Sequence, residues 1–293
     1  MSAAVILMAY GSPERLADVP AYYADIRGGR PIAPDKLEDL VERYRRLGIE
    51  DDNPLNTITG ETRGALEREL GMPVFIGMRH WQPRIAEAAR KAHDVGADTI
   101  VGLVLAPHYS RMSIGVYRRL LEKAVAGSPK LLFIESWHDT TGFIDLLADR
   151  VRGTSAHVVF TAHSLPQRIL ADGDPYAGQL LETAGLVADR AGITDWSFSY
   201  QSASPTGEPW LGPDILDHLA DLHARGVQAV LVCPVGFVAD HLEIRWDLDT
   251  VATERARDLG MGFTRIQMLN ADPAFIQVLA GLVRAQLADP QDA

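Results

Sequence analysis

Eight short apolar runs alternate with helical stretches along the chain, and this alternation limits the possible folds more than any other feature. The runs are rich in Val, Ile, Leu and Phe without strict alternation of polar residues, which is typical of strands buried on both faces. Strands and helices in repeated alternation predict parallel βαβ units. The predicted strands are Ala4–Ala9, Pro73–Met78, Thr99–Leu105, Leu131–Glu135, Ala156–Thr161, Asp195–Tyr200, Gln228–Cys233 and Gly262–Gln267.

The eight strands fall into two groups of four, with a break near residues 152–155. We therefore predict an α/β fold of two similar doubly wound halves, each with a four-stranded parallel sheet flanked by helices, and a cleft between them. The N-terminal half should span residues 1–153 and the C-terminal half residues 154–270, and residues 271–293 should form a last helix that packs back on the first half. The predicted helices are Asp35–Leu47, Thr59–Leu70, Pro83–Val95, Ser113–Ala126, Gly142–Arg152, Pro175–Ala191, Pro213–Ala224 and Pro273–Leu287.

The charge of the chain excludes one class of partner and restricts another. A formal net charge of −11 argues against nucleic acid. An anionic ligand would need a local basic cluster, because the overall field repels it. Residues 27–46 supply six Arg and Lys side chains against four acids. The alternative for this segment is an ordinary solvated helix of mixed charge.

Composition indicates a soluble globular protein, with 47% hydrophobic and 23% charged residues. No apolar run is long enough to cross a bilayer, and the N-terminus lacks the basic region of a signal peptide, so we expect a cytoplasmic protein. The single cysteine, Cys233, rules out internal disulfides and a four-thiolate iron–sulfur cluster within one chain. We expect a monomer without a bound cofactor.

Residues 228–249 join a buried strand to a dense group of ionisable side chains. The apolar run stops at Pro234 and Gly236, which interrupt a strand. Helical spacing then places Glu243 and Asp247 four residues apart on one face. Like charges so close repel each other, so this helix either faces water or awaits a cation. Because open α/β sheets bind ligands beyond the carboxyl ends of their strands, we favour the cation.

Five of the nine histidines directly follow a predicted strand, and the other four fall elsewhere and look structural. The strand-end histidines should gather at the carboxyl edges of the sheets. Any one of them could be an ordinary hydrogen-bonded packing residue. Several together, with carboxylates and a tyrosine nearby, indicate a metal or proton-transfer site. The five are His80, His108, His138, His163 and His241.

The common catalytic motifs are missing from the sequence. There is no G-x-S-x-G, no G-x-G-x-x-G after the first strand, no Walker loop and no H-E-x-x-H. Their absence argues against the common hydrolases and against enzymes that bind dinucleotides or nucleoside triphosphates. His163 and Glu243 facing each other across the cleft would instead form a sparse site for ferrous iron, since imidazole suits iron and a carboxylate suits cation delivery and proton removal.

The segments around these two residues resemble the signature segments of ferrochelatases. They read Val-Phe-Thr-Ala-His-Ser-Leu-Pro at residues 159–166 and Pro-Val-Gly-Phe-Val-Ala-Asp-His-Leu-Glu at residues 234–243. The family has a class II chelatase-like fold, with a four-stranded parallel sheet in each of two halves, which agrees with the strand count. Further similar segments, spread over nearly the whole chain, are Leu105–Ser110, Glu135–Trp137, Gly173–Tyr176 and Trp210–Asp214.

The first loop is similar to that of the coproporphyrin-type members of the family. There the tyrosine at position 10 approaches the iron from one face, whereas protoporphyrin-type relatives usually carry Leu or Met. The resemblance also assigns the basic cluster to the carboxylates of the macrocycle, which guanidinium groups can bind in a forked geometry. The residues implied to bind the porphyrin are Tyr10, Arg27, Arg43, Tyr44, Asn53 and Tyr117, with Asn53 standing where the family often has Ser.

The resemblance implies insertion of Fe²⁺ into coproporphyrin III, giving Fe-coproporphyrin in haem biosynthesis. His163 and Glu243 would be catalytic and, with Tyr10, would contact the metal. The alternatives are insertion into protoporphyrin IX, a chelatase for another tetrapyrrole or for cobalt, and, in a different class, a non-catalytic haem-binding protein. The supporting residues would be His80, His241 and Asp247.

Overall fold

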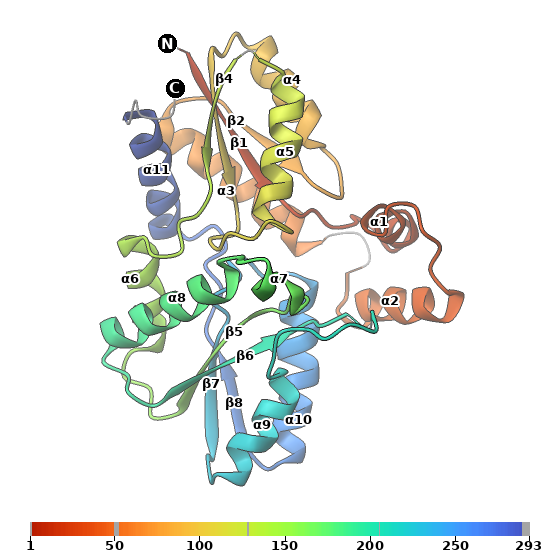
Figure 1. Cartoon of the computed structure of the whole chain (residues 1–293), viewed down its shortest axis with the longest axis vertical. Coiled ribbons are helices and arrows are strands. Elements are labelled where there is room, and N and C mark those ends of the chain that lie inside the picture. Colours follow the sequence, from red (N-terminus) through yellow and green to blue (C-terminus); the bar gives the residue numbers. More distant parts are fainter. Residues whose placement is uncertain (1, 50–52, 128, 205, 289–293) are drawn as a thin grey trace.

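The computed structural model describes residues 2–49, 53–127, 129–204 and 206–288. Its strands form two four-stranded sheets, ordered β2-β1-β3-β4 and β6-β5-β7-β8, in which every pairing is parallel (Figure 1). The two sheets have the same strand order, which confirms the predicted fold class of two similar halves. The strands are β1 Ala3–Ala9, β2 Val74–Met78, β3 Thr99–Val104, β4 Lys130–Ile134, β5 His157–His163, β6 Trp196–Gln201, β7 Ala229–Cys233 and β8 Gly262–Arg265.

All eight predicted helices are present, with shifted ends. The second begins at Pro54 instead of Thr59, because Asn53 caps it by accepting a hydrogen bond from the Leu55 amide. Three short helices, α1, α7 and η1, were not predicted, and α10 continues the helix predicted around Glu243 and Asp247. The helices are α1 Val19–Ile26, α2 Pro34–Arg46, α3 Pro54–Leu70, α4 Ile85–Asp94, α5 Ile114–Val125, α6 Thr141–Val151, α7 Arg168–Ala171, α8 Tyr176–Ala191, α9 Ile215–Ala224, α10 Thr253–Asp258 and α11 Pro273–Ala288, together with a 3₁₀-helix, η1 (Leu16–Asp18), and a π-helix, η2 (Ile244–Ala252).

Both faces of each sheet are covered, as the apolar strands require. Along β1, Val5 and Leu7 point into the core that includes Leu66 of α3, whereas Ile6 and Met8 point into the core beneath α4 and α5. This is the period of two expected for a strand. A strand buried on both faces needs apolar residues at every position, which explains why the strand runs show no polar alternation.

Two helices tie the halves together. The helix α6 packs against α8 of the C-terminal half, and α11 returns to pack against α3 and β4 of the N-terminal half (Figure 1). Arg284 of α11 donates to the Glu69 carboxylate of α3 at 2.8 Å, and the rings of Trp137 and Phe275 lie 6.0 Å apart. These contacts join the two halves on either side of the division expected after residue 153. Residues 289–293 of the predicted last segment lie outside the described residues.

The helix after β7 is a π-helix for its first nine residues. Two threonines support this rare geometry, in which backbone amides bond five residues back. The hydroxyl of Thr250 donates to the carbonyl of Arg245 at 3.0 Å, and that of Thr253 to the carbonyl of Leu248 at 2.9 Å. Both bonds span five residues. The sequence predicted a helix here but not its type.

The loop that leads from β7 to η2 is pressed against β5. The Gly236 amide donates to the carbonyl of Thr161 at 3.2 Å, and a Cβ at Gly236 would lie only 2.6 Å from that of Ala162. Only glycine fits this approach, so the loop is held directly beside His163 at the end of β5. Among the described residues, no helix has the length and apolar character needed to cross a membrane.

Replacing Gly236 with Ala should destabilise the protein by about 1–3 kcal/mol, the usual cost of overpacking. The new methyl group would have to displace the backbone of β5 or of the loop. Urea unfolding measures the change. Gly185→Ala is the matched control, because Gly185 lies inside α8 with open space around it and should gain up to ~1 kcal/mol from higher helix propensity. Equal stabilities for the two variants would contradict the packing argument.

Candidate active site

The two residues at the centre of the predicted site lie together, but both belong to the C-terminal half, so the expectation that they face each other across the cleft was wrong. His163 is the last residue of β5, and Glu243 directly precedes η2, which follows the neighbouring strand β7. The His163 Nδ1 and Glu243 Oε2 atoms are 3.1 Å apart, and the side chains are 31% and 37% exposed. His241 Nε2 lies 3.9 Å from the same oxygen. The site therefore presents an imidazole–carboxylate pair that solvent and ligands can reach.

The two charges of the pair stabilise each other. Burial alone would lower the pKa of His163, but the carboxylates of Glu243 and Asp247 outweigh it and raise that pKa above its usual value. Burial would likewise raise the pKa of Glu243, but His163 and His241 lower it far below its usual range. Glu243 therefore stays ionised and favours the protonated form of His163.

Asp247 is the third acid-base group of the site. Burial, with a contribution from the charge of Glu243, raises its pKa to about 6, although a hydrogen bond from Ser202 opposes the shift. Gln201 donates to the backbone carbonyl of Glu243 at 3.2 Å and accepts from Thr161 at 3.1 Å. Gln201 and Ser202, at the end of β6, therefore position Glu243 and Asp247. The sequence analysis missed Gln201 and Ser202, although they follow a strand as the five histidines do.

Tyr10 approaches from the N-terminal half. It follows β1, its side chain is 41% exposed, and its ring centroid lies 4.6 Å from that of His80. Partial burial, reinforced by the charge of Glu243, raises the pKa of Tyr10 to about 12. The charge of Glu243 thus acts on Tyr10 although the two residues belong to different halves. Tyr10 is a neutral phenol at physiological pH.

His80 is held by an ionic network that the sequence analysis did not predict. Its Nδ1 lies 2.8 Å from Asp25 Oδ2, and Arg84 Nη2 lies 2.8 Å from Asp25 Oδ1. Burial lowers the pKa of His80 more than Asp25 raises it, so the ring is neutral and donates its Nδ1 proton to Asp25. The Nε2 atom is then an acceptor. Asp25 lies in α1, a helix that the sequence analysis also missed.

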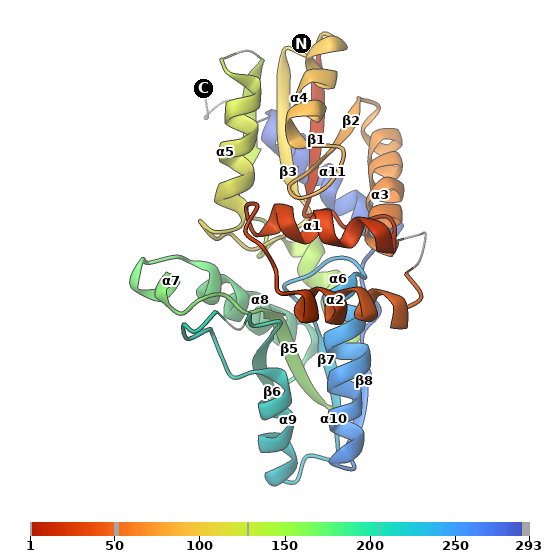
Figure 2. The same cartoon turned by 90° about the vertical axis from the view of Figure 1, so that its right-hand side faces the viewer.

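Of the two arginines predicted to bind carboxylates, Arg27 lies at the C-terminal end of α1 and Arg43 lies within α2. These helices cross in front of the region where the halves meet (Figure 2). Arg27 donates to the backbone carbonyls of Arg30 and Pro31 at 3.4 and 3.1 Å, and makes no ion pair among the described residues. Arg43 lies over the ring of Trp246 of η2, 5.5 Å from its centroid. Arg43 therefore links α2 to the π-helix.

Three other predicted porphyrin-binding residues are buried, each at most 3% exposed. Asn53 donates to the Ser12 hydroxyl at 2.7 Å, and Ser12 is also hydrogen-bonded to Tyr44. Tyr117 lies beneath the guanidinium of Arg79, which is 5.8 Å from its ring centroid and 5.9 Å from that of Tyr10. Arg79 thus links Tyr117 to Tyr10 and is a further cation of the site, which was not predicted.

Two strand-end histidines join the halves away from this site. His108 Nε2 lies 2.9 Å from the Thr183 hydroxyl, and His138 Nε2 lies 2.9 Å from Glu182 Oε2, both partners being on α8. They are structural, which is the alternative that the sequence left open for each histidine. Within the described ranges, no group of three or more His, Cys, Asp or Glu side chains is arranged to hold a metal ion.

The chain is similar to known proteins over nearly its whole length. A model of the ferrochelatase family matches residues 2–287. A ferrochelatase of Herpetosiphon aurantiacus is 42% identical over 97% of this chain and 98% of its own, and a coproporphyrin III ferrochelatase of Geobacillus sp. is 39% identical over 95% and 96%. SirB from Bacillus subtilis with Fe³⁺ has the same fold, with a TM-score of 0.65 at 11% identity over 98% of this chain and 96% of SirB. The chain therefore belongs to the ferrochelatase family, as its signature segments predict.

Proposed function

We propose that this protein inserts Fe²⁺ into coproporphyrin III and so produces Fe-coproporphyrin for haem biosynthesis. The observation that carries the proposal is the His163–Glu243 pair, 3.1 Å apart, whose carboxylate charge also acts on Tyr10 of the other half. Several relatives named coproporphyrin III ferrochelatase support the choice of porphyrin. Porphyrin and Fe²⁺ are both substrates here, and the reaction as proposed uses no further cofactor and takes place in the cytoplasm in a monomer.

Insertion exchanges two pyrrole N–H protons for one Fe²⁺ ion, so the site must accept protons as well as supply the metal. Glu243 stays ionised and can bind the arriving cation. The positive charge of the metal favours loss of the His163 proton, and the neutral imidazole can then accept a pyrrole proton. Asp247, with a pKa of about 6, can pass protons to solvent. Tyr10, neutral, faces the macrocycle from the other side.

The arginines give an anionic porphyrin a local attraction that the net charge of −11 does not. Arg27 bonds only backbone carbonyls among the described residues, so it can turn to a propionate without breaking an ion pair. Arg43 lies beside the π-helix and can reach a second propionate. Tyr44, Asn53 and Tyr117 are buried, so their contact with the porphyrin requires the side chains that cover them to move when it binds.

Anaerobic Fe²⁺ insertion, followed by absorbance, tests the proposal. Coproporphyrin III, protoporphyrin IX and sirohydrochlorin should be compared, each with Fe²⁺ and with Co²⁺. The highest kcat/KM is expected for Fe²⁺ with coproporphyrin III. A preference for another tetrapyrrole would reassign the substrate, and tight porphyrin binding without insertion would indicate a haem-binding protein instead.

Replacing Glu243 with Gln should move the acidic limb of the pH profile to lower pH. In the wild type, activity is lost as the pH falls through the pKa of His163, which Glu243 raises above about 6.5. Without the carboxylate, burial dominates and that pKa falls. Residual kcat/KM against pH, together with an NMR titration of His163, measures the shift. Asp247→Asn serves as the control. If the acidic limb of the pH profile moves only in this variant, the limb reports the titration of Asp247 and not of His163.

Replacing Arg27 with Ala should weaken coproporphyrin binding about tenfold, equivalent to ~1.4 kcal/mol for one lost charge-assisted contact. The kcat at saturating porphyrin should change little, because Arg27 bonds the carbonyls of Arg30 and Pro31 and not the His163–Glu243 pair. Fluorescence titration gives the Kd. Arg30→Ala, which removes a neighbouring arginine of the same loop, is the matched control. A larger loss in kcat than in affinity would contradict the propionate assignment.

A further inference from the structure

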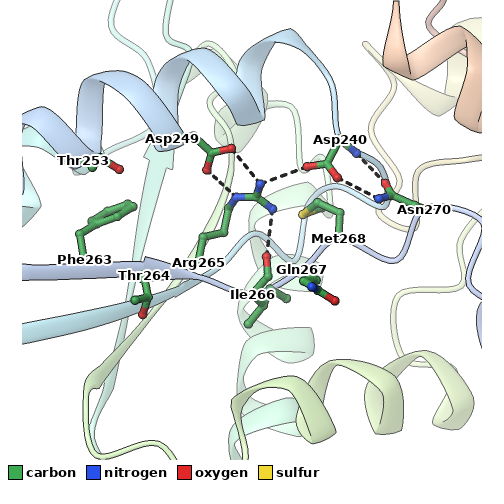
Figure 3. A pocket seen from close by; sticks show the side chains of 10 residues that line it. All are labelled: Asp240, Asp249, Thr253, Phe263, Thr264, Arg265, Ile266, Gln267, Met268 and Asn270. Carbon is green, nitrogen blue, oxygen red and sulfur yellow. Dashed lines mark hydrogen bonds and ion pairs between the residues drawn. The ribbon is translucent and has the colours of Figure 1, made fainter. Parts of the chain in front are cut away.

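A cluster of charged side chains outside the active site surrounds Arg265, the last residue of the edge strand β8 (Figure 3). The Nε and Nη2 atoms of Arg265 bind the Asp249 carboxylate at 2.8 and 2.9 Å, and Nη2 also lies 3.1 Å from Asp240 Oδ1. Nη1 donates to the carbonyl of Ile266 at 2.9 Å. Only 14% of the Arg265 side chain is exposed. One buried guanidinium thus bridges two acids.

Asn270 fixes Asp240 from the other side. Its side-chain amide donates to Asp240 Oδ2 at 2.8 Å, and its side-chain oxygen accepts from the Asp240 backbone amide at 2.8 Å (Figure 3). The Asn270 backbone amide donates to the carbonyl of Val238 at 2.8 Å. The loop between β7 and η2 is therefore bound through both its backbone and its side chain to the segment that follows β8.

The same residues line a solvent-open cavity of about 550 Å³. Its charged lining residues are Asp240, Asp249 and Arg265, and they are bound to one another (Figure 3). None of these three charges is therefore unpaired and available to attract an ionic ligand. The contacts point to an internal clamp and not to a second binding site.

The two acids bridged by Arg265 bracket the segment that carries the chemistry. Asp240 lies three residues before Glu243, and Asp249 lies two residues after Asp247 within the π-helix. His241 lies between them and bonds the carbonyl of Ala239 at 2.9 Å. A single guanidinium therefore fixes both ends of residues 240–249, and with them the position of Glu243 relative to His163.

We propose that Arg265 is a positioning residue for iron insertion, which clamps Asp240 to Asp249 and so holds Glu243 against His163. This inference rests on the function proposed above for the same site. Arg265 does not touch the substrates and acts only through the two acids. Without it, two carboxylates would face each other with no cation between them, and their repulsion would spread the ends of the segment.

Four variants test the clamp: Arg265→Met, Asp249→Asn, the combination of both, and Arg257→Met as the control. Arg257 is a 74% exposed arginine of α10 that makes only a long 3.9 Å contact with its neighbour Asp258. The measurements are thermal unfolding, kcat and KM for Fe²⁺ insertion into coproporphyrin III, and the ring resonances of His163 in the NMR spectrum at pH 7. The spectrum of His163→Gln assigns those resonances.

Arg265→Met should lower kcat about tenfold to a hundredfold, the effect of a small misplacement of a reacting group, while KM for the porphyrin stays within about twofold. The His163 resonances should move, and the combined variant should be no slower than Arg265→Met alone, because both changes break one clamp. The control should match the wild type.

A folded Arg265→Met protein with unchanged kcat and unchanged His163 resonances would overturn the proposal, as would a loss of thermal stability alone. If Arg265→Met does not fold, Asp249→Asn decides the question, since it keeps the shape of the side chain and removes the charge. If the wild type inserts no iron, the function proposed above fails, and the His163 resonances still show whether the clamp places Glu243.

Discussion

An imidazole at the end of β5 and a carboxylate beyond the neighbouring strand β7, 3.1 Å apart, define what this protein can do. Each charge is stable only because the other is present: His163 keeps its proton against burial, and Glu243 stays ionised against burial. Each half therefore supplies something different. The C-terminal half supplies a polarised pair, and the N-terminal half supplies Tyr10, a neutral hydroxyl that does not compete for the charge.

Several contacts hold the segment that carries Glu243 in place. Gly236 allows the loop from β7 to press against β5, the π-helix continues from Glu243, and Arg265 joins the loop to the π-helix. Trp246 of the same helix lies beneath Arg43 of α2, so the π-helix also contacts the helices that cross in front of the site. The acids of the site thus lie on a segment that neighbouring elements support on several sides.

The fold could be predicted because buried parallel strands leave an unmistakable apolar pattern, and all eight strands lie where the pattern placed them. The site could be predicted in outline, because His163 and Glu243 follow strands and lie in distinctive segments. The sequence could not indicate the π-helix, because nine residues hold too few apolar positions to distinguish its period from that of an α-helix. Nor could it indicate the Asp25–Arg84 and Arg265–Asp249 pairs, because partners 59 and 16 residues apart meet only after folding.

The return of α11 to the N-terminal half affects how the chain can fold during translation. One face of the first sheet is covered partly by α11, whose residues are the last of the described chain to leave the ribosome. Until then, apolar side chains of β3 and β4 lack their final cover. The first half therefore cannot complete its folding during translation ahead of the second, and both halves must reach the native state together.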